Sequence, residues 1–124
     1  MQGAGSSLAP ATLGEEAMPF YLIQAAYTDK ADAAMILHPQ HREAVLRKTC
    51  KALGGKMHNF FFSFGKYDAL VLAELPDNKA AAALSLSAEA GGAARMVHTT
   101  VLLTVEEAMA AMKMAQTDKY KPPA

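Results

Sequence analysis

The apolar positions gather most densely between Lys56 and Leu75, where two runs of strand length flank Gly65 and Lys66. Four phenylalanines fall within residues 60–64, and residues 69–75 are almost wholly aliphatic. Aromatic and aliphatic side chains suit a pleated strand, and glycine adopts the positive φ of a tight turn without a Cβ clash. The pattern therefore predicts a β-hairpin with strands over residues 57–64 and 69–75.

Strict alternation along the first of these strands predicts which side chains share a face. One face would carry His58, Phe60, Phe62 and Phe64, and the other Met57, Asn59, Phe61 and Ser63. Neither face of the hairpin has the polar pattern of a solvated surface, so both must be covered. We expect helices on one side of the sheet and a second subunit on the other.

Before the hairpin, residues 19–27 alternate as a further strand, and residues 28–38 are expected to be a connection. Pro39 suits the first turn of a helix that continues to about Leu53 and ends at Gly54 and Gly55. The inner stripe of this helix is predicted to be Val45, Leu46, Thr49, Cys50 and Leu53. Its outer side is predicted to be Arg42, Glu43, Arg47, Lys48 and Lys51.

After the hairpin, Asp77 is a predicted N-cap for an alanine-rich helix that ends at Gly91 and Gly92. Residues 94–103 form a predicted fourth strand. Thr104 and Glu107 have the spacing of a capping box, so a third helix is expected, with Ala108, Met109 and Met112 facing inward. The terminal stretches 1–17 and 117–124 lack periodicity and are expected to be flexible extensions of a single domain over residues 18–116.

This order of elements, strand–helix–strand–strand–helix–strand with an added C-terminal helix, predicts an α+β fold of the ferredoxin-like type. Its antiparallel four-stranded sheet would carry helices on one face. The other face would stay uncovered in a single chain, so we expect a homodimer in the form of a dimeric α/β barrel.

Composition narrows the classes of partner. The 124 residues carry 12 basic and 12 acidic side chains, so no net charge favours nucleic acid or an anionic membrane surface. No apolar stretch approaches the roughly 20 residues of a membrane helix. A single cysteine, Cys50, excludes an internal disulfide framework, and a reduced cytoplasmic setting is expected.

The hairpin and its flanks resemble a known family. Leu53-Gly54-Gly55-Lys56 precedes the aromatic strand, Phe64-Gly65-Lys66-Tyr67-Asp68 forms the turn, and Pro76-Asp77 follows the aliphatic strand. Together these segments resemble the GYD domain family of small bacterial and archaeal proteins, over about residues 18–112. The resemblance implies the ferredoxin-like, dimeric α/β-barrel fold and no particular reaction.

Two pairs of residues are candidates for chemistry. His58 and His98 lie mid-strand, and His58 shares its predicted face with three phenylalanines, a setting expected for a general base in an apolar pocket. Strand histidines are more often packed or hydrogen-bonded. Tyr67 and Asp68 have a structural interpretation, in which Asp68 accepts backbone N–H bonds at the turn. In their functional interpretation they are polar groups at a pocket mouth.

Other side chains carry weaker signals. His38 and His41 are three residues apart at a helix start, but no third metal ligand stands at a convincing spacing. Cys50 on an inner stripe is expected to be an inert buried thiol. The sequence contains no phosphate loop, serine elbow or metal signature, so we expect neither metal nor cofactor.

Three functions remain open from the sequence. The first is a binding module for a small apolar molecule. Its pocket would lie between helices and sheet, with Tyr67 and Asp68 at one end, and would be lined by Tyr21, Ile23, Phe60, Phe62 and His98. The second is a cofactor-independent enzyme of the small oxygenase or isomerase type, with His58 or His98 as base. The third is a subunit whose role is assembly alone.

Overall fold

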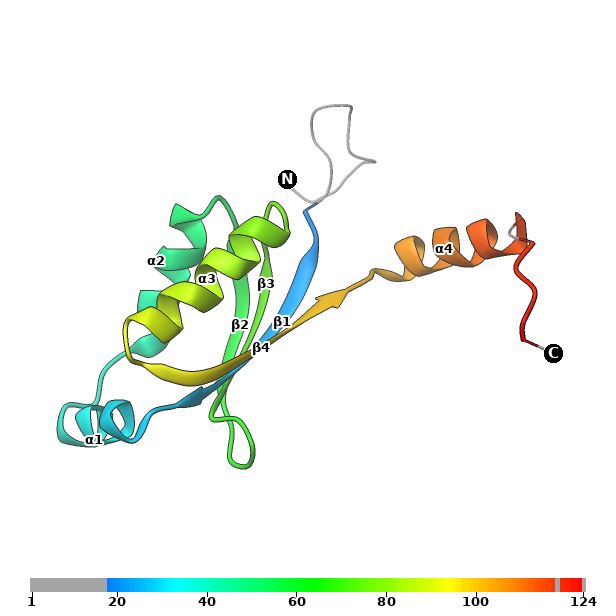
Figure 1. The fold of residues 1–124 in the computed structure, drawn as a ribbon. Coiled ribbons are helices and arrows are strands. Elements are labelled where there is room, and N and C mark those ends of the chain that lie inside the picture. Colours follow the sequence, from blue (N-terminus) through cyan, green and yellow to red (C-terminus); the bar gives the residue numbers. More distant parts are fainter. Residues whose placement is uncertain (1–17, 118, 124) are drawn as a thin grey trace.

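The computed structural model describes residues 18–117 and 119–123, and the N-terminal extension predicted over 1–17 lies outside them. The described chain forms four strands and four helices (Figure 1). In order, these are β1 (Phe20–Tyr27), α1 (Asp29–Leu37), α2 (Arg42–Ala52), β2 (Lys56–Phe62), β3 (Ala69–Glu74), α3 (Asn78–Ala90), β4 (Ala94–Leu102) and α4 (Val105–Thr117).

The four strands form one antiparallel sheet in the order β2-β3-β1-β4. Helices α2 and α3 lie side by side over one face of this sheet (Figure 1). The sequence prediction of a ferredoxin-like α+β fold with helices on one face is therefore confirmed. The predicted dimer remains a prediction, because a single chain is described.

The hydrophobic core lies between the sheet and α2 and α3. Alternate residues of the two central strands point into it, because successive side chains of a strand face opposite ways. The buried members of this core are Tyr21, Ile23, Cys50, Met57, Val71, Ala73, Leu75, Ala81 and Leu84.

Both predicted helix caps are present. The Asp77 carboxylate accepts the Ala80 N–H at 2.9 Å at the start of α3. At the start of α4, the Glu107 carboxylate accepts the Thr104 N–H at 2.8 Å and the Thr104 hydroxyl accepts the Glu107 N–H at 3.1 Å. These bonds satisfy N–H groups that the helix itself leaves unpaired.

Residues 28–38, expected as a connection, instead contain helix α1. Its N-cap is Thr28, whose hydroxyl accepts the Ala31 N–H at 3.1 Å, and Asp29 and Asp32 stand in its first turn. No residue of α1 is buried. The helix therefore has capping and propensity but no apolar stripe, which is the signal that the sequence prediction required.

A β-bulge overturns the predicted faces of β2. Met57 pairs with Ala73 and Asn59 with Leu72, so His58 is the extra residue. Paired residues share a face, and beyond the bulge Phe60 pairs with buried Val71. Met57, Phe60 and Phe62 therefore lie on the helix-covered face, whereas His58, Asn59 and Phe61 lie on the other.

Within residues 18–117 and 119–123, no helix covers the face of the sheet opposite α2 and α3 (Figure 1). We call it the open face. Cross-strand pairing places Leu22 beside Leu72 at its centre, with Leu70 two residues along β3. Further apolar residues on this face are Phe20, Phe61, Met96 and Leu102.

Helix α4 continues the line of β4 away from the sheet (Figure 1). Its residues Met109 and Met112, predicted to face inward, are exposed in the single chain. Their prediction rested on helical spacing, which identifies an apolar stripe but not what covers it. No described helix combines the length and apolarity needed to cross a bilayer. Beyond α4, residues 119–123 have no regular secondary structure.

Candidate functional site

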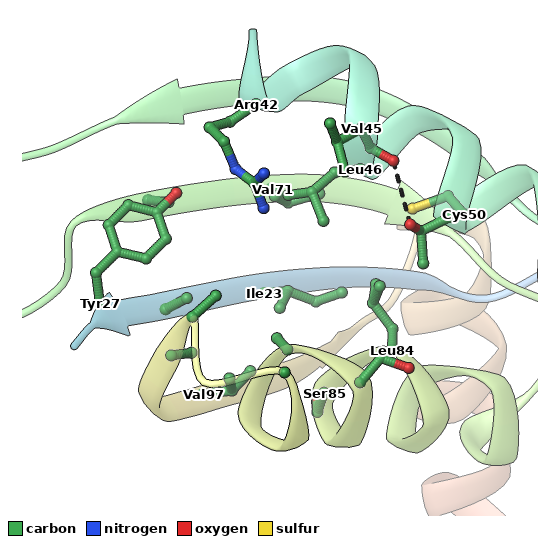
Figure 2. Close-up of a pocket in the computed structure, with 18 residues that line it drawn as sticks. Ile23, Tyr27, Arg42, Val45, Leu46, Cys50, Val71, Leu84, Ser85 and Val97 are labelled. Carbon is green, nitrogen blue, oxygen red and sulfur yellow. Dashed lines mark hydrogen bonds between the residues drawn. The ribbon is translucent and has the colours of Figure 1, made fainter. Parts of the chain in front are cut away.

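An apolar pocket of about 260 Å³ lies between the sheet and helices α2 and α3 (Figure 2). Aliphatic side chains from α2, α3 and the sheet form most of its wall: Ile23, Val45, Leu46, Val71, Leu84 and Val97. Two hydroxyl groups in the wall are already engaged. The Thr49 hydroxyl donates to the Val45 carbonyl at 3.1 Å, and Ser85 lies 3.2 Å from the Thr99 hydroxyl.

One end of this pocket is polar. The Arg42 guanidinium and the Tyr27 hydroxyl point toward this end, from α2 and β1 respectively (Figure 2). Burial raises the pKa of the Tyr27 phenol, and the nearby Arg42 charge opposes that rise, while Asp68 and Asp32 add to it. The phenol therefore stays protonated at neutral pH and acts as a hydrogen-bond donor.

The opposite end of the pocket contains Cys50, which is completely buried. Burial raises the pKa of this thiol, and the positive charge of Arg47 opposes the rise only in part. Thiolate is the nucleophilic form of cysteine, so the geometry favours an unreactive packed thiol.

Of the predicted ligand-binding residues, only Ile23 lines this pocket. Tyr21 lies in the core, and its hydroxyl donates to the Asn78 side-chain oxygen at 2.7 Å. Phe60 packs against the core. Phe62 contacts Phe60 edge-on, at 5.1 Å between ring centroids, and lines a separate open hollow beside α1.

The two histidines proposed as bases both lie on the open face. The His58 ring nitrogen is 2.7 Å from the Glu74 carboxylate, and the ring stacks on Phe20 at 5.6 Å between centroids. His98 is exposed and lies beside Tyr67, with 6.3 Å between ring centroids. The β1 register separates them, because Glu74 pairs with Phe20 and His98 with Gln24. The structure therefore does not bring the two histidines together.

Asp68 connects the hairpin to β1. Its carboxylate accepts the Tyr27 N–H at 2.8 Å, and its own N–H donates to the Ala25 carbonyl at 2.8 Å. Its carbonyl accepts the Ser63 N–H at 2.8 Å across the turn. The bonds to β1 extend the β3–β1 pairing to the residue before β3 begins, and the bond to Ser63 extends the β2–β3 pairing. They correspond to the structural interpretation that the sequence offered for this residue. Asp68 also lines the hollow beside α1.

Changing Asp68 to alanine is expected to destabilise the fold by about 1–3 kcal/mol, because the Tyr27 N–H loses its acceptor. Asp68→Asn keeps an acceptor oxygen and is expected to lose less than about 1 kcal/mol. Urea unfolding of both variants measures the difference. If Asp68→Ala is as stable as the wild type, this carboxylate does not stabilise the fold.

Sequence reasoning missed Arg42 as a site residue because it assigned the charged side chains of α2 to the outer side. The spacing contained the signal, since Val45, Leu46 and Thr49 lie three, four and seven residues after Arg42. Residues at these intervals share one helix face. Arg42 therefore belongs to the same stripe as the apolar wall, and all four residues line the pocket.

No metal-binding cluster of three or more His, Cys, Asp or Glu side chains occurs in residues 18–117 and 119–123. His41 acts as the N-cap of α2, where its Nδ1 accepts the Ala44 N–H at 3.3 Å. A ring nitrogen used in this way is not free to bind a metal.

Comparison with family models finds a match to the GYD domain over residues 21–112. The matched segment begins in β1, ends within α4, and includes both helices that cover the sheet. Comparisons with curated proteins and with solved structures find no match to this chain.

Proposed function

Because the chain belongs to the GYD domain family, and because its domain holds an apolar pocket between helices and sheet, we propose that it is a small-molecule-binding module. The pocket is the observation that carries this proposal. Small-molecule sites are usually concave and mostly apolar, with a few polar groups that orient the ligand. A pocket of about 260 Å³ with an aliphatic wall and one polar end has this form.

We further propose that the module is a homodimer joined through the open face. Its apolar residues, Leu22, Leu70 and Leu72 among them, form a continuous surface on the two central strands. Contiguous apolar patches of this kind usually mark an interaction site. A second copy offers a matching sheet face. The buried free thiol of Cys50 fits a cytoplasmic setting.

The alternative of an enzyme with a pocket histidine finds less support. Among the described residues that line the pocket there is no histidine. His58 is paired with Glu74 on the open face, where a dimer partner would cover it. A subunit with an assembly role alone would require no pocket, so the cavity favours binding over that third possibility.

Native mass spectrometry of gently purified protein from its own source tests the binding proposal. The wild type is expected to carry an added small mass. Ala88→Phe fills the pocket from α3 and is expected to remove that mass, whereas Ala82→Phe, at an exposed position of the same helix, is expected to keep it. Circular dichroism establishes that both variants are folded.

The binding proposal would be contradicted if the wild type carried no added mass and if its amide NMR spectrum did not change when apolar compounds were added. An added mass retained by folded Ala88→Phe protein would place the ligand outside this pocket, and the proposed site would then be wrong.

A further inference from the structure

Resting on the proposed binding function, we infer that the natural ligand is a small amphipathic carboxylate. Its anionic head would bind between the Arg42 guanidinium and the Tyr27 hydroxyl, and its apolar tail would fill the pocket between α2, α3 and the sheet. Three observations carry this inference: the unused donors at one pocket end, the apolar wall behind them, and the size of the cavity.

The hydroxyl of Tyr27 is the first observation. Tyr27 as a whole residue is only 9% exposed, and its hydroxyl has no hydrogen-bond partner in the part of the chain that the structure describes. Buried polar atoms are nearly always hydrogen-bonded, and an exception calls for an unseen water, ion or ligand. A protonated phenol that points toward the pocket end is a donor without an acceptor.

Arg42 provides the second donor. Its guanidinium makes one side-chain hydrogen bond within residues 18–117 and 119–123, to the Gln40 side-chain oxygen at 3.1 Å. The ion pairs of this described region join other residues, Arg47 with Glu43 and His58 with Glu74. Guanidinium offers five N–H donors in a planar fork that matches a carboxylate. Most of that capacity is therefore available to a ligand.

The charged side chains near the Tyr27 end of the pocket limit the charge that a bound head group can carry. Asp68 and Asp32 both influence Tyr27, but the Arg42 charge has the larger effect of the three. The Asp68 carboxylate is already bonded to the Tyr27 N–H. One cation with two carboxylates nearby suits a head group with one negative charge, rather than a phosphate with two.

The wall and the volume of the pocket limit the kind of apolar tail that the ligand can have. Behind Arg42 the pocket is lined by aliphatic side chains of α2, α3 and the sheet (Figure 2). A water molecule occupies roughly 30 Å³ in the liquid, so about 260 Å³ accommodates roughly nine groups of that size. A straight monocarboxylic acid of medium length, or an aromatic acid of similar volume, fits these limits.

Octanoate and 1-octanol are the probes, because they share a tail and differ in the charge of the head. Titration of isotope-labelled protein, followed by amide NMR, gives the affinity for each. We expect octanoate to bind the wild type at least about tenfold more tightly than 1-octanol, since only the carboxylate forms charge-assisted hydrogen bonds with Arg42.

Single substitutions distinguish the contributions of Arg42 and Tyr27 to octanoate binding from the effect of overall protein charge. Arg42→Gln is expected to weaken octanoate binding about tenfold or more and Tyr27→Phe several-fold, with 1-octanol binding unchanged. Arg42→Lys keeps the charge and is expected to retain part of the affinity. Lys48→Gln removes the same charge from an exposed position of α2 and is expected to leave octanoate binding at the wild-type level.

The outcomes distinguish this inference from the proposed function. If 1-octanol binds as tightly as octanoate, or if Arg42→Gln and Lys48→Gln have equal effects, the pocket binds ligands but the carboxylate inference is wrong. If neither probe binds the wild type and the purified protein carries no added mass, the proposed function fails together with it.

Discussion

Gly55→Ala is expected to destabilise the protein by about 3 kcal/mol, at the upper end of the usual cost of overpacking. Gly55 lies between α2 and β2, where its backbone passes against the end of β3. A Cβ atom at this position would overlap the Glu74 carbonyl oxygen and lie 2.6 Å from the Leu75 Cδ2 atom. The first of these is backbone and Leu75 is fully buried, so neither can move away cheaply.

Gly92→Ala is the matched comparison for Gly55→Ala. Gly92 has a φ of 79°, but a Cβ atom there meets nothing within 4 Å. Its replacement therefore incurs only the conformational cost of the left-handed region, about 1–2 kcal/mol. Urea unfolding measures both, and a lower midpoint with an unchanged m-value identifies a loss of stability. If Gly55→Ala is no less stable than Gly92→Ala, the close approach does not limit this site.

The helix ends that the sequence predicted correctly are marked by capping residues or by glycines. Asp77 and Thr104 cap helices at the expected positions, and Gly54 and Gly55 follow α2. Such residues act locally, through a hydrogen bond or an allowed backbone angle, so their effect is readable without knowledge of the rest of the fold. The strand–helix order that they define then leaves few possible topologies.

The errors arose where tertiary context decides. The bulge at His58 follows from how β2 pairs with β3, and neither glycine nor proline marks it in the sequence. That one extra residue moved Phe60 and Phe62 to the opposite face from His58. Helix α4 was predicted correctly as a helix, but Met109 and Met112, expected to face inward, are exposed in the single chain, because the helix itself does not decide what covers them.

The candidate site was predicted in position but not in composition. A pocket between helices and sheet was expected, and one is present, with Ile23 in its wall. Aromatic residues were chosen for that wall because they are large and apolar. In the structure, large side chains such as Tyr21 fill space in the core, and the pocket remains where smaller residues, Ala69 and Ala94 for example, line the sheet.

Leu72→Asp is expected to convert the proposed homodimer to monomers. Leu72 lies on central strand β3 beside Leu22 and is only partly covered in the single chain. Its carboxylate would therefore be solvated in a monomer but buried and unpaired in a face-to-face dimer. An uncompensated buried charge costs about 3–5 kcal/mol, and each dimer would contain two. We expect the dissociation constant to rise at least about 100-fold.

Sedimentation velocity over a range of concentrations measures this change, and Leu86→Asp is its matched control. Leu86 is 63% exposed on α3, so the same substitution there tests the opposite side of the molecule. A dimer that survives Leu72→Asp but dissociates with Leu86→Asp would locate the interface on the helical side. Because the pocket lies under the helices and the proposed interface lies on the other face, Leu72→Asp monomers should still bind octanoate. Loss of that binding would instead show that the pocket depends on the dimer.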